Sequence, residues 1–230
     1  MNTDICNKQI KMSIYQKQEK IKNFLNFLIH KYNSPTNIQF SLEPASFRFE
    51  ENTINMSLIE LKNDSIEELL WTIAHEYRHH LQFMGKVNNE FKNHYSTRLF
   101  KIKQCKDSIK RNSYSLLLIP IMIGIFKDFP ILMLCMNLPI ITLFLFFVNK
   151  PGIDLYLWLS DESNLRFEKD LEKDADFFAN CEVGTGNLVW GRFKDDLDFS
   201  ESKTQHPSHE ERYLESLKFK LNPQIVPFLR

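Results

Sequence analysis

The chain has 230 residues, of which 43% are apolar and 25% are charged, as in one ordinary globular domain with or without a membrane element. Its 29 Lys and Arg residues balance 29 Asp and Glu residues, so the basic excess typical of nucleic-acid-binding proteins is missing. With six Gly, nine Pro and many apolar residues, the chain is neither linker-rich nor intrinsically disordered.

Helix and strand patterns alternate in the first part of the chain. Residues 9–33 place apolar side chains at helical spacing, and Asn33-Ser34-Pro35 ends this predicted helix. Apolar and polar residues then alternate over 38–42, which predicts a strand. The same alternation over 46–49 and 53–57 predicts a short hairpin.

The next predicted helix covers residues 65–84. Ser65 and Glu68 form an S-x-x-E capping box, in which each side chain satisfies a backbone amide of the first turn. An apolar stripe follows, and Gly85 fits the C-terminal cap. The sequence therefore predicts an amphipathic helix with one face in the core.

This helix contains His75-Glu76-Tyr77-Arg78-His79, an H-E-x-x-H motif. Residues i and i+4 share a helical face, so both imidazoles can reach one ion. Zinc takes neutral imidazole nitrogens in tetrahedral geometry, and Glu76 can accept a proton from water at the metal. The alternative is a surface helix with solvated histidines, and Arg78 favours it because a charge between two zinc-binding histidines is unusual.

A long apolar block interrupts the polar chain. Residues 88–112 predict a basic helix, with a solvated face as the simplest interpretation. Of the 34 residues in 115–148, 25 are apolar, and only Lys127 and Asp128 are charged. This block predicts a transmembrane or re-entrant hairpin, and a buried pair of core helices is the alternative.

The C-terminal part offers a third ligand. Residues 160–180 predict a helix, 181–205 irregular structure and 208–220 a closing helix. Glu172 and Asp176 are i and i+4, so one can bind metal while the other fixes a ligating imidazole. Asp170 and Asp174 are expected to project elsewhere as solvated acids. The alternative for Glu172 and Asp176 is that they too are solvated.

Three patches in this order resemble one family. H-E-x-x-H, an apolar hairpin, E-x-x-A-D-x-x-A from Glu172 and H-P-x-x-x-E-R from His206 are similar to the HtpX and CAAX prenyl endopeptidase family of membrane zinc metallopeptidases. The resemblance covers roughly residues 44–220. It implies the zinc ligands His75, His79 and Glu172, with Glu76 as the general base.

The resemblance also implies supporting residues. Asp176 would contact a zinc-binding histidine, and His206 and Arg212 would lie near the substrate, where they are expected to stabilise the oxyanion. The strand before the zinc helix would be an edge strand that binds the peptide substrate. In this chain the strand residues are Ser46, Phe47, Arg48 and Phe49.

We therefore expect an α+β fold: a mostly helical zincin-type metallopeptidase domain with a small β-hairpin or sheet and an inserted hydrophobic helical hairpin. Residues 1–112 would supply the N-terminal helix, the small sheet and the H-E-x-x-H helix. Residues 113–149 would be the membrane hairpin, and 150–230 the third-ligand helix and the C-terminal part of the same domain.

The expected function is that of a membrane-anchored zinc metalloendopeptidase. Its partners would be a polypeptide substrate, such as a membrane protein, and the lipid bilayer, but no nucleic acid. Because the ligands flank the apolar block, both ends of the block must lie on one side, and the basic stretch predicts a catalytic domain facing the cytoplasm. The alternatives are a membrane-tethered, non-catalytic regulator with a zinc scaffold and an IrrE-like zinc protease.

Overall fold

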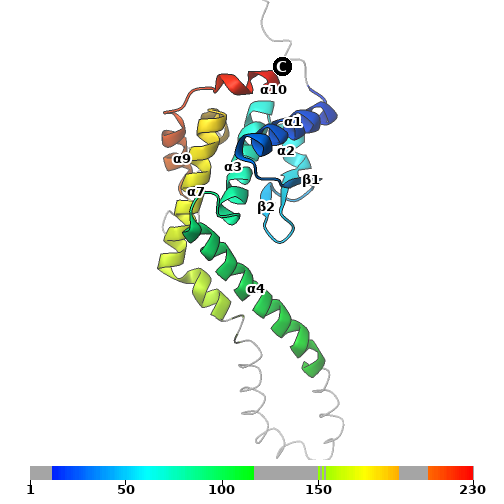
Figure 1. Cartoon of the computed structure of the whole chain (residues 1–230), viewed down its shortest axis with the longest axis vertical. Helices are drawn as coiled ribbons and strands as arrows, with labels where there is room; N and C mark the ends of the chain where they lie inside the picture. The colour runs from blue at the N-terminus through cyan, green and yellow to red at the C-terminus, as the bar shows by residue number, and fades with distance from the viewer. Residues whose placement is uncertain (1–11, 117–149, 151, 153, 192–206, 230) are drawn as a thin grey trace, which may run out of the picture. The chain divides into compact units, whose positions relative to one another are not determined.

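The computed structural model describes residues 12–116, 150, 152, 154–191 and 207–229. These residues are mostly helical, and they include one three-stranded sheet (Figure 1), which confirms the α+β prediction at this level. The chain divides into two compact units, one comprising Met1–Asn89 and Glu168–Arg230 and the other Glu90–Phe167.

The first unit begins with a capped helix and the sheet. Helix α1 (Ile14–Tyr32) starts at Ser13, whose side chain accepts from the backbone of Gln16, and it ends at Asn33 in the left-handed conformation. The predicted strands are confirmed as β1 (Asn37–Ser41), β2 (Ser46–Arg48) and β3 (Thr53–Ser57). Phe49, predicted to be in β2, lies in the turn after it.

The order of the strands is β1-β3-β2, so β3 is central and β2 lies at an edge. The predicted hairpin is confirmed, because β2 pairs with β3 in antiparallel fashion. β1 pairs with β3 in parallel, although β2 lies between them in the sequence. All five residues of β3 are buried, which places this strand in the middle of the unit.

Two helices follow the sheet. The short α2 (Leu58–Asn63) was not predicted, and it starts at Ser57, whose hydroxyl accepts from the backbone of Glu60. α3 (Ile66–Phe83) starts with the predicted capping box, in which both reciprocal hydrogen bonds are present. Fourteen of its 18 residues are buried, so α3 is the central helix of this unit.

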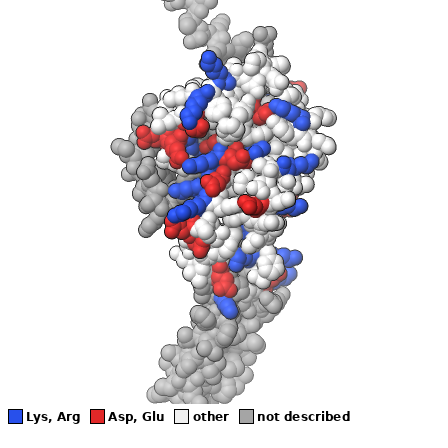
Figure 2. All heavy atoms as spheres, turned by 60° about the vertical axis from the view of Figure 1, so that its left-hand side comes forward, with Lys and Arg blue, Asp and Glu red and all other residues white. Residues whose placement is uncertain are grey.

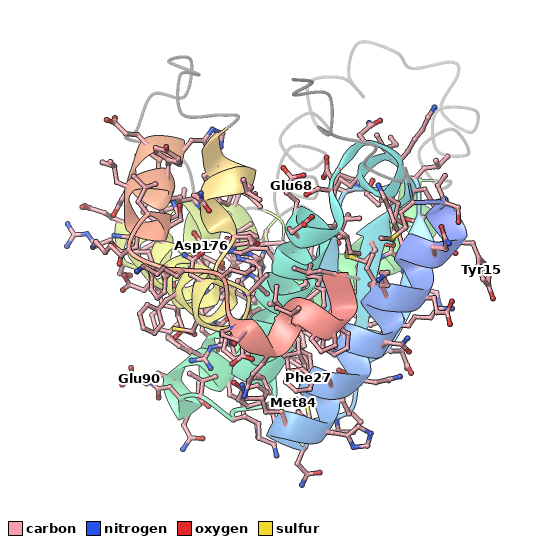
Figure 3. The ribbon with its side chains drawn as sticks, turned by 90° about the horizontal axis from the view of Figure 1, so that it is seen from above. Tyr15, Phe27, Glu68, Met84, Glu90 and Asp176 are labelled. Atoms are coloured by element: carbon pink, nitrogen blue, oxygen red, sulfur yellow. The ribbon has the colours of Figure 1, made fainter. Side chains whose placement is uncertain are left out.

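The C-terminal part of the first unit is helical. Its helices are α7 (Glu162–Glu182), α8 (Gly186–Gly191), α9 (His209–Ser216), the short η1 (Pro223–Ile225) and α10 (Val226–Leu229). The part of α7 that belongs to this unit begins at Glu168. The expectation of irregular structure over 181–205 is thus wrong for α8. α10 packs on α1, on which Figure 3 labels Phe27. The ring of Phe228 in α10 lies 5.3 Å from that of Phe24 and 5.7 Å from that of Phe27.

The second unit contains α4 (Asn89–Leu116), which confirms the helix predicted over 88–112. Residues 154–160 are also helical. Aromatic contacts hold this unit together: the ring of His94 lies 4.6 Å from that of Phe167 and 5.1 Å from that of Trp158.

Within the described ranges, no helix is at once long enough and apolar enough to cross a membrane. The predicted membrane localisation, with the catalytic domain facing the cytoplasm, is therefore wrong. A spanning helix needs about 20 mostly apolar residues, whereas the 28 residues of α4 are rich in charged and polar side chains. The hairpin predicted over 113–149 lies outside the described residues, apart from 113–116 at the end of α4.

Charges of both signs are interspersed on the surface of the first unit. Figure 2 shows basic and acidic side chains next to one another on the face in view. Lys173 of α7, for example, pairs with Glu211 of α9 at 2.7 Å, with both side chains about half exposed. Such pairs contribute little to stability, so the buried contacts decide how α7 and α9 are held.

Candidate metal centre

Two helices bring the three predicted ligands together. His75 and His79 lie one turn apart on α3, and Glu172 lies on α7, which packs beside it. One donor atom from each of the three residues lies within 4.8 Å of the other two. His75 is 7% and His79 is 9% exposed, so the group is shielded from bulk water.

The donor atoms are nearly equidistant. The Nε2 atoms of His75 and His79 are 3.1 Å apart. The two carboxylate oxygens of Glu172 lie 3.4 Å from these nitrogens, Oε2 from His75 and Oε1 from His79. Two imidazole nitrogens and a carboxylate therefore face one point, as in a three-ligand site for a divalent cation.

Asp176 supports His75 from behind. Its Oδ1 lies 2.9 Å from Nδ1 of His75, as predicted for the residue one turn after Glu172. Because a carboxylate only accepts hydrogen bonds, this contact favours the tautomer with the proton on Nδ1. The lone pair of Nε2 is then directed at the metal position.

Arg212 of α9 holds Asp176 in place. Its Nε and Nη2 donate to the two oxygens of Asp176, and Nη2 is 3.6 Å from Glu172. Arg212 is 8% and Asp176 is 6% exposed, so this pair is buried. The guanidinium carbon also lies 3.7 Å from the ring centroid of Trp190, which fixes the plane of the guanidinium.

His79 has a different support, which the sequence analysis missed. Its Nδ1 lies 2.9 Å from Oε1 of Gln82, a fully buried residue one turn further along α3. The amide nitrogen of Gln82 donates to the backbone oxygen of Leu171 and to Asp174. The spacing of three residues from His79 to Gln82 was the available signal, since i and i+3 are neighbours on a helix.

Asp174 and Arg78 do not behave as expected. Asp174 was expected to be a solvated acid, but it accepts two hydrogen bonds from Arg78 and one from Gln82. Arg78 is consequently bound to α7, and its guanidinium carbon lies 5.0 Å from the ring centroid of Phe178. The unusual charge in the H-E-x-x-H motif thus connects α3 to α7.

An aromatic side chain covers one face of the first ligand. The ring of Trp71 stacks on that of His75 at 5.3 Å, and its Nε1 donates to the buried Asn180 at 2.8 Å. Trp190 meets Trp71 edge-on at 5.6 Å. These contacts restrict the rotation of the His75 ring.

The electrostatics of the group favour positive charge at the two Nε2 atoms. Burial lowers the pKa of His75, but Asp176 and Glu172 outweigh it and raise this pKa to about 10. The pKa of His79 is also raised, because Glu172 outweighs the effect of burial. Burial raises the pKa of Asp176, yet Arg212 and His75 bring it below its usual value. Protons or a metal ion can supply the positive charge that these carboxylates favour.

Glu76 follows His75 on α3 and is 8% exposed. Within the described part of the chain, no hydrogen bond or ion pair engages its carboxylate. Its charge acts on His79, which raises the pKa of that histidine. Figure 3 labels Glu68 in the first turn of the same helix, and it labels Asp176 on α7.

The other residues predicted for the site are those of the expected edge strand and His206. Phe47 of β2 points into the core, where its ring lies 5.5 Å from that of His80, and Phe49 packs on Phe83. Ser46 and Arg48 complete the edge strand, so a role of these four residues in substrate binding stays a prediction. His206 lies outside the described residues.

Comparison with known proteins adds no relative. No protein-family model matches the chain, and neither a curated protein nor a solved structure matches it.

Proposed function

We propose that the protein is a zinc-dependent peptidase with a zincin-type fold, in which His75, His79 and Glu172 hold the metal. The observation that carries this proposal is the convergence of two imidazole nitrogens and one carboxylate on a single point. The order of the motifs, which resembles the HtpX and CAAX prenyl endopeptidase family, supports it.

The donor set and its spacing fit zinc. Ligands at 2.0–2.1 Å in a tetrahedron are separated by about 3.3 Å from one another. The corresponding separations here are 3.1, 3.4 and 3.4 Å. Three protein ligands also leave one tetrahedral position open, which is typical of catalytic rather than structural zinc sites.

The chain's own residues would divide the work. When bound, zinc supplies Lewis-acid chemistry that makes water acidic near neutral pH. Glu76, whose carboxylate is not engaged elsewhere in the described chain, would accept a proton from that water and donate it to the leaving amine. Asp176 would hold the ring of His75, and Arg212 would act as a positioning residue through Asp176.

A polypeptide is the proposed substrate. The β2 strand has a free edge within the described sheet, because only β3 pairs with it. An extended peptide can add to such an edge through main-chain hydrogen bonds. Ser46 and Arg48 would provide that edge.

One of the arguments for the alternative function, a non-catalytic zinc scaffold, is weakened by the contacts of Arg78. Arg78, which is unusual between the two histidines, favoured it together with Ala45, but the guanidinium of Arg78 contacts Asp174 and Phe178. The retention of Glu76 also favours catalysis, since a scaffold has no need of a general base.

The proposal is tested with the full chain and its Glu76→Gln variant. We expect about one zinc per chain in both proteins, because Glu76 is not a ligand. The wild type should cleave an unfolded protein such as casein, and a chelator should stop the cleavage. Glu76→Gln should be about 10²–10⁴-fold slower, the usual contribution of proton transfer. A wild-type chain that binds zinc but cleaves neither casein nor a peptide library would overturn the proposal, and so would an equally active variant.

A further inference from the structure

We propose that Gln82 is a positioning residue that fixes the orientation of the metal ligand His79, and that Asp174 and Arg78 exist to hold Gln82. This inference rests on the metal site in the proposed function, and it concerns residues that the H-E-x-x-H motif does not include.

The hydrogen bonds of Gln82 determine which way its amide points. Its Nε2 lies 3.0 Å from the backbone oxygen of Leu171 and 2.8 Å from Oδ2 of Asp174. Both partners are acceptors, so the NH₂ group must face them and the amide oxygen must face the other side. With the side chain fully buried, no water can offer an alternative arrangement.

The amide oxygen in turn determines the tautomer of His79. Oε1 of Gln82 lies 2.9 Å from Nδ1 of His79, and an amide oxygen can only accept. Nδ1 therefore carries the proton, and Nε2 presents its lone pair to the metal position, 3.1 Å from the equivalent atom of His75. Gln82 thus does for His79 what Asp176 does for His75.

Asp174 and Arg78 make this arrangement rigid. Arg78 binds both oxygens of Asp174 at 2.7 and 2.9 Å, so the carboxylate cannot rotate away from Gln82. The chain of contacts runs from Arg78 on α3 to Asp174 on α7 and back to Gln82 on α3. This chain of contacts gives the arginine between the two histidines a role.

The two supports differ in charge, and the difference suits the site. His75 is backed by a carboxylate, whereas His79 is backed by a neutral amide. Glu172 and Asp176 already place two negative charges beside the ion. A neutral partner orients His79 without adding a further carboxylate next to Asp174, where like charges would repel.

The test measures zinc affinity in the full chain by competition with a chelating dye. Gln82→Met keeps the volume but removes the hydrogen bonds to His79, Leu171 and Asp174, and it should weaken zinc binding about 10–100-fold, as losing a partner of a metal-bound histidine usually does. Asp170→Asn, a change at an exposed acid one turn before Asp174 on α7, is the control and should bind zinc as the wild type does.

A double-mutant cycle separates orientation from packing. Gln82→Glu should weaken zinc binding, because the new carboxylate faces Asp174. Adding Asp174→Asn should restore part of the affinity, since the new amide can donate to Glu while Glu accepts from His79 and only the backbone oxygen of Leu171 still faces the carboxylate. A role in packing alone would leave the double variant no better than the two single variants. The absorption bands of the Co²⁺-loaded protein should shift in Gln82→Met and stay unchanged in Asp170→Asn.

The outcomes distinguish this inference from the proposed function. A wild-type chain that binds no zinc overturns both. A wild type that binds zinc, together with a folded Gln82→Met that binds it equally well, overturns the role of Gln82 alone. The same conclusion follows if the double variant shows no recovery over Gln82→Glu.

Discussion

Arg78 and Asp174 form a bidentate ion pair between α3 and α7, with Nε 2.7 Å from Oδ2 and Nη2 2.9 Å from Oδ1. The pair lies beside the candidate metal centre. About four-fifths of the surface of the Arg78 side chain is shielded from water. The position of the pair joins the helix with two of the candidate metal ligands to the helix with the third. The distance between the ligands therefore depends on a contact outside the ligand set.

The loss of this ion pair should destabilise the fold. Asp174→Asn removes a charge-assisted bidentate contact and should lower the free energy of unfolding by about 1–3 kcal/mol. Asp170→Asn, on the exposed side of α7, should change it by less than about 0.5 kcal/mol. Urea unfolding of the metal-free proteins measures both. Equal effects of the two changes would contradict the role given to Asp174.

Glu172 should be indispensable for the metal. Glu172→Ala removes the only carboxylate among the three converging donors, so zinc should be lost on dialysis. Elemental analysis after gel filtration measures the remaining metal. Asp170→Asn again serves as the control, and it should keep its zinc. Metal retained by Glu172→Ala would exclude Glu172 as a ligand.

Asp176 should affect both metal affinity and stability. Asp176→Asn weakens the support of His75 and leaves Arg212 without its buried partner charge. We expect zinc to bind about 10–100-fold more weakly. The free energy of unfolding should fall by about 3–5 kcal/mol, as it does when one partner of a buried ion pair is removed.

A surface pair between the same two helices provides the control for Asp176. Glu211→Gln breaks the exposed pair with Lys173, which also joins α7 and α9. It should cost at most about 1 kcal/mol and leave zinc binding unchanged. Calorimetry and dye competition on both variants show whether the loss of a buried pair costs more stability and zinc affinity than the loss of an exposed pair.

The placement of the two candidate histidine ligands was predictable because it follows from local spacing. The capping box at Ser65 places the start of α3, and the periods of three and four residues then place His75 and His79 on one face. On α7 the same period also relates Asp170 to Asp174, and the resemblance to the metallopeptidase family was what favoured Glu172 and Asp176. The sequence was sufficient for the two histidines because both lie on one long, capped helix.

The remaining features depend on contacts between distant segments. Arg78 could not be assigned to Asp174 from sequence, because the rotation of α7 against α3 decides which acid it meets. The parallel pairing of β1 with β3 has no local signal either, since a strand pattern does not name its partner. Helix α8 was missed because its six residues are held by packing, with Gly186 buried against its neighbours.

Gly186 should not tolerate a side chain. A Cβ at this position would collide with Oδ1 of Asn180 and lie 2.9 Å from Nε1 of Trp71, the two atoms of one hydrogen bond. Gly186→Ala should therefore lower the free energy of unfolding by about 1–3 kcal/mol, as overpacking does. At Gly191, the other end of α8, the nearest atom would be 3.5 Å away. Thermal unfolding should show Gly191→Ala close to the wild type, and a similar loss in both variants would contradict this reason.

Glu60 of α2 should make stability depend on pH. Burial raises its pKa above the ordinary value of 4.5, the charges of Asp64 and Glu76 add to this, and a backbone hydrogen bond with Ala45 opposes it. The folded chain therefore holds a proton on Glu60 at pH values where the unfolded chain has lost it. Stability from this group is present below pH 4.5 and is lost as the pH rises through the folded pKa.

The variant Glu60→Gln isolates this contribution. It carries no charge at any pH, so it should be more stable than the wild type at pH 7, and the gain should disappear near pH 4. Urea unfolding of both proteins at the two pH values, with a chelator present so that metal release does not contribute, gives the difference. Glu19→Gln, at an exposed position on α1, should show no such change with pH. A Glu60→Gln variant that is less stable than the wild type at pH 7 would mean that the carboxylate of Glu60 is favourable in its charged form.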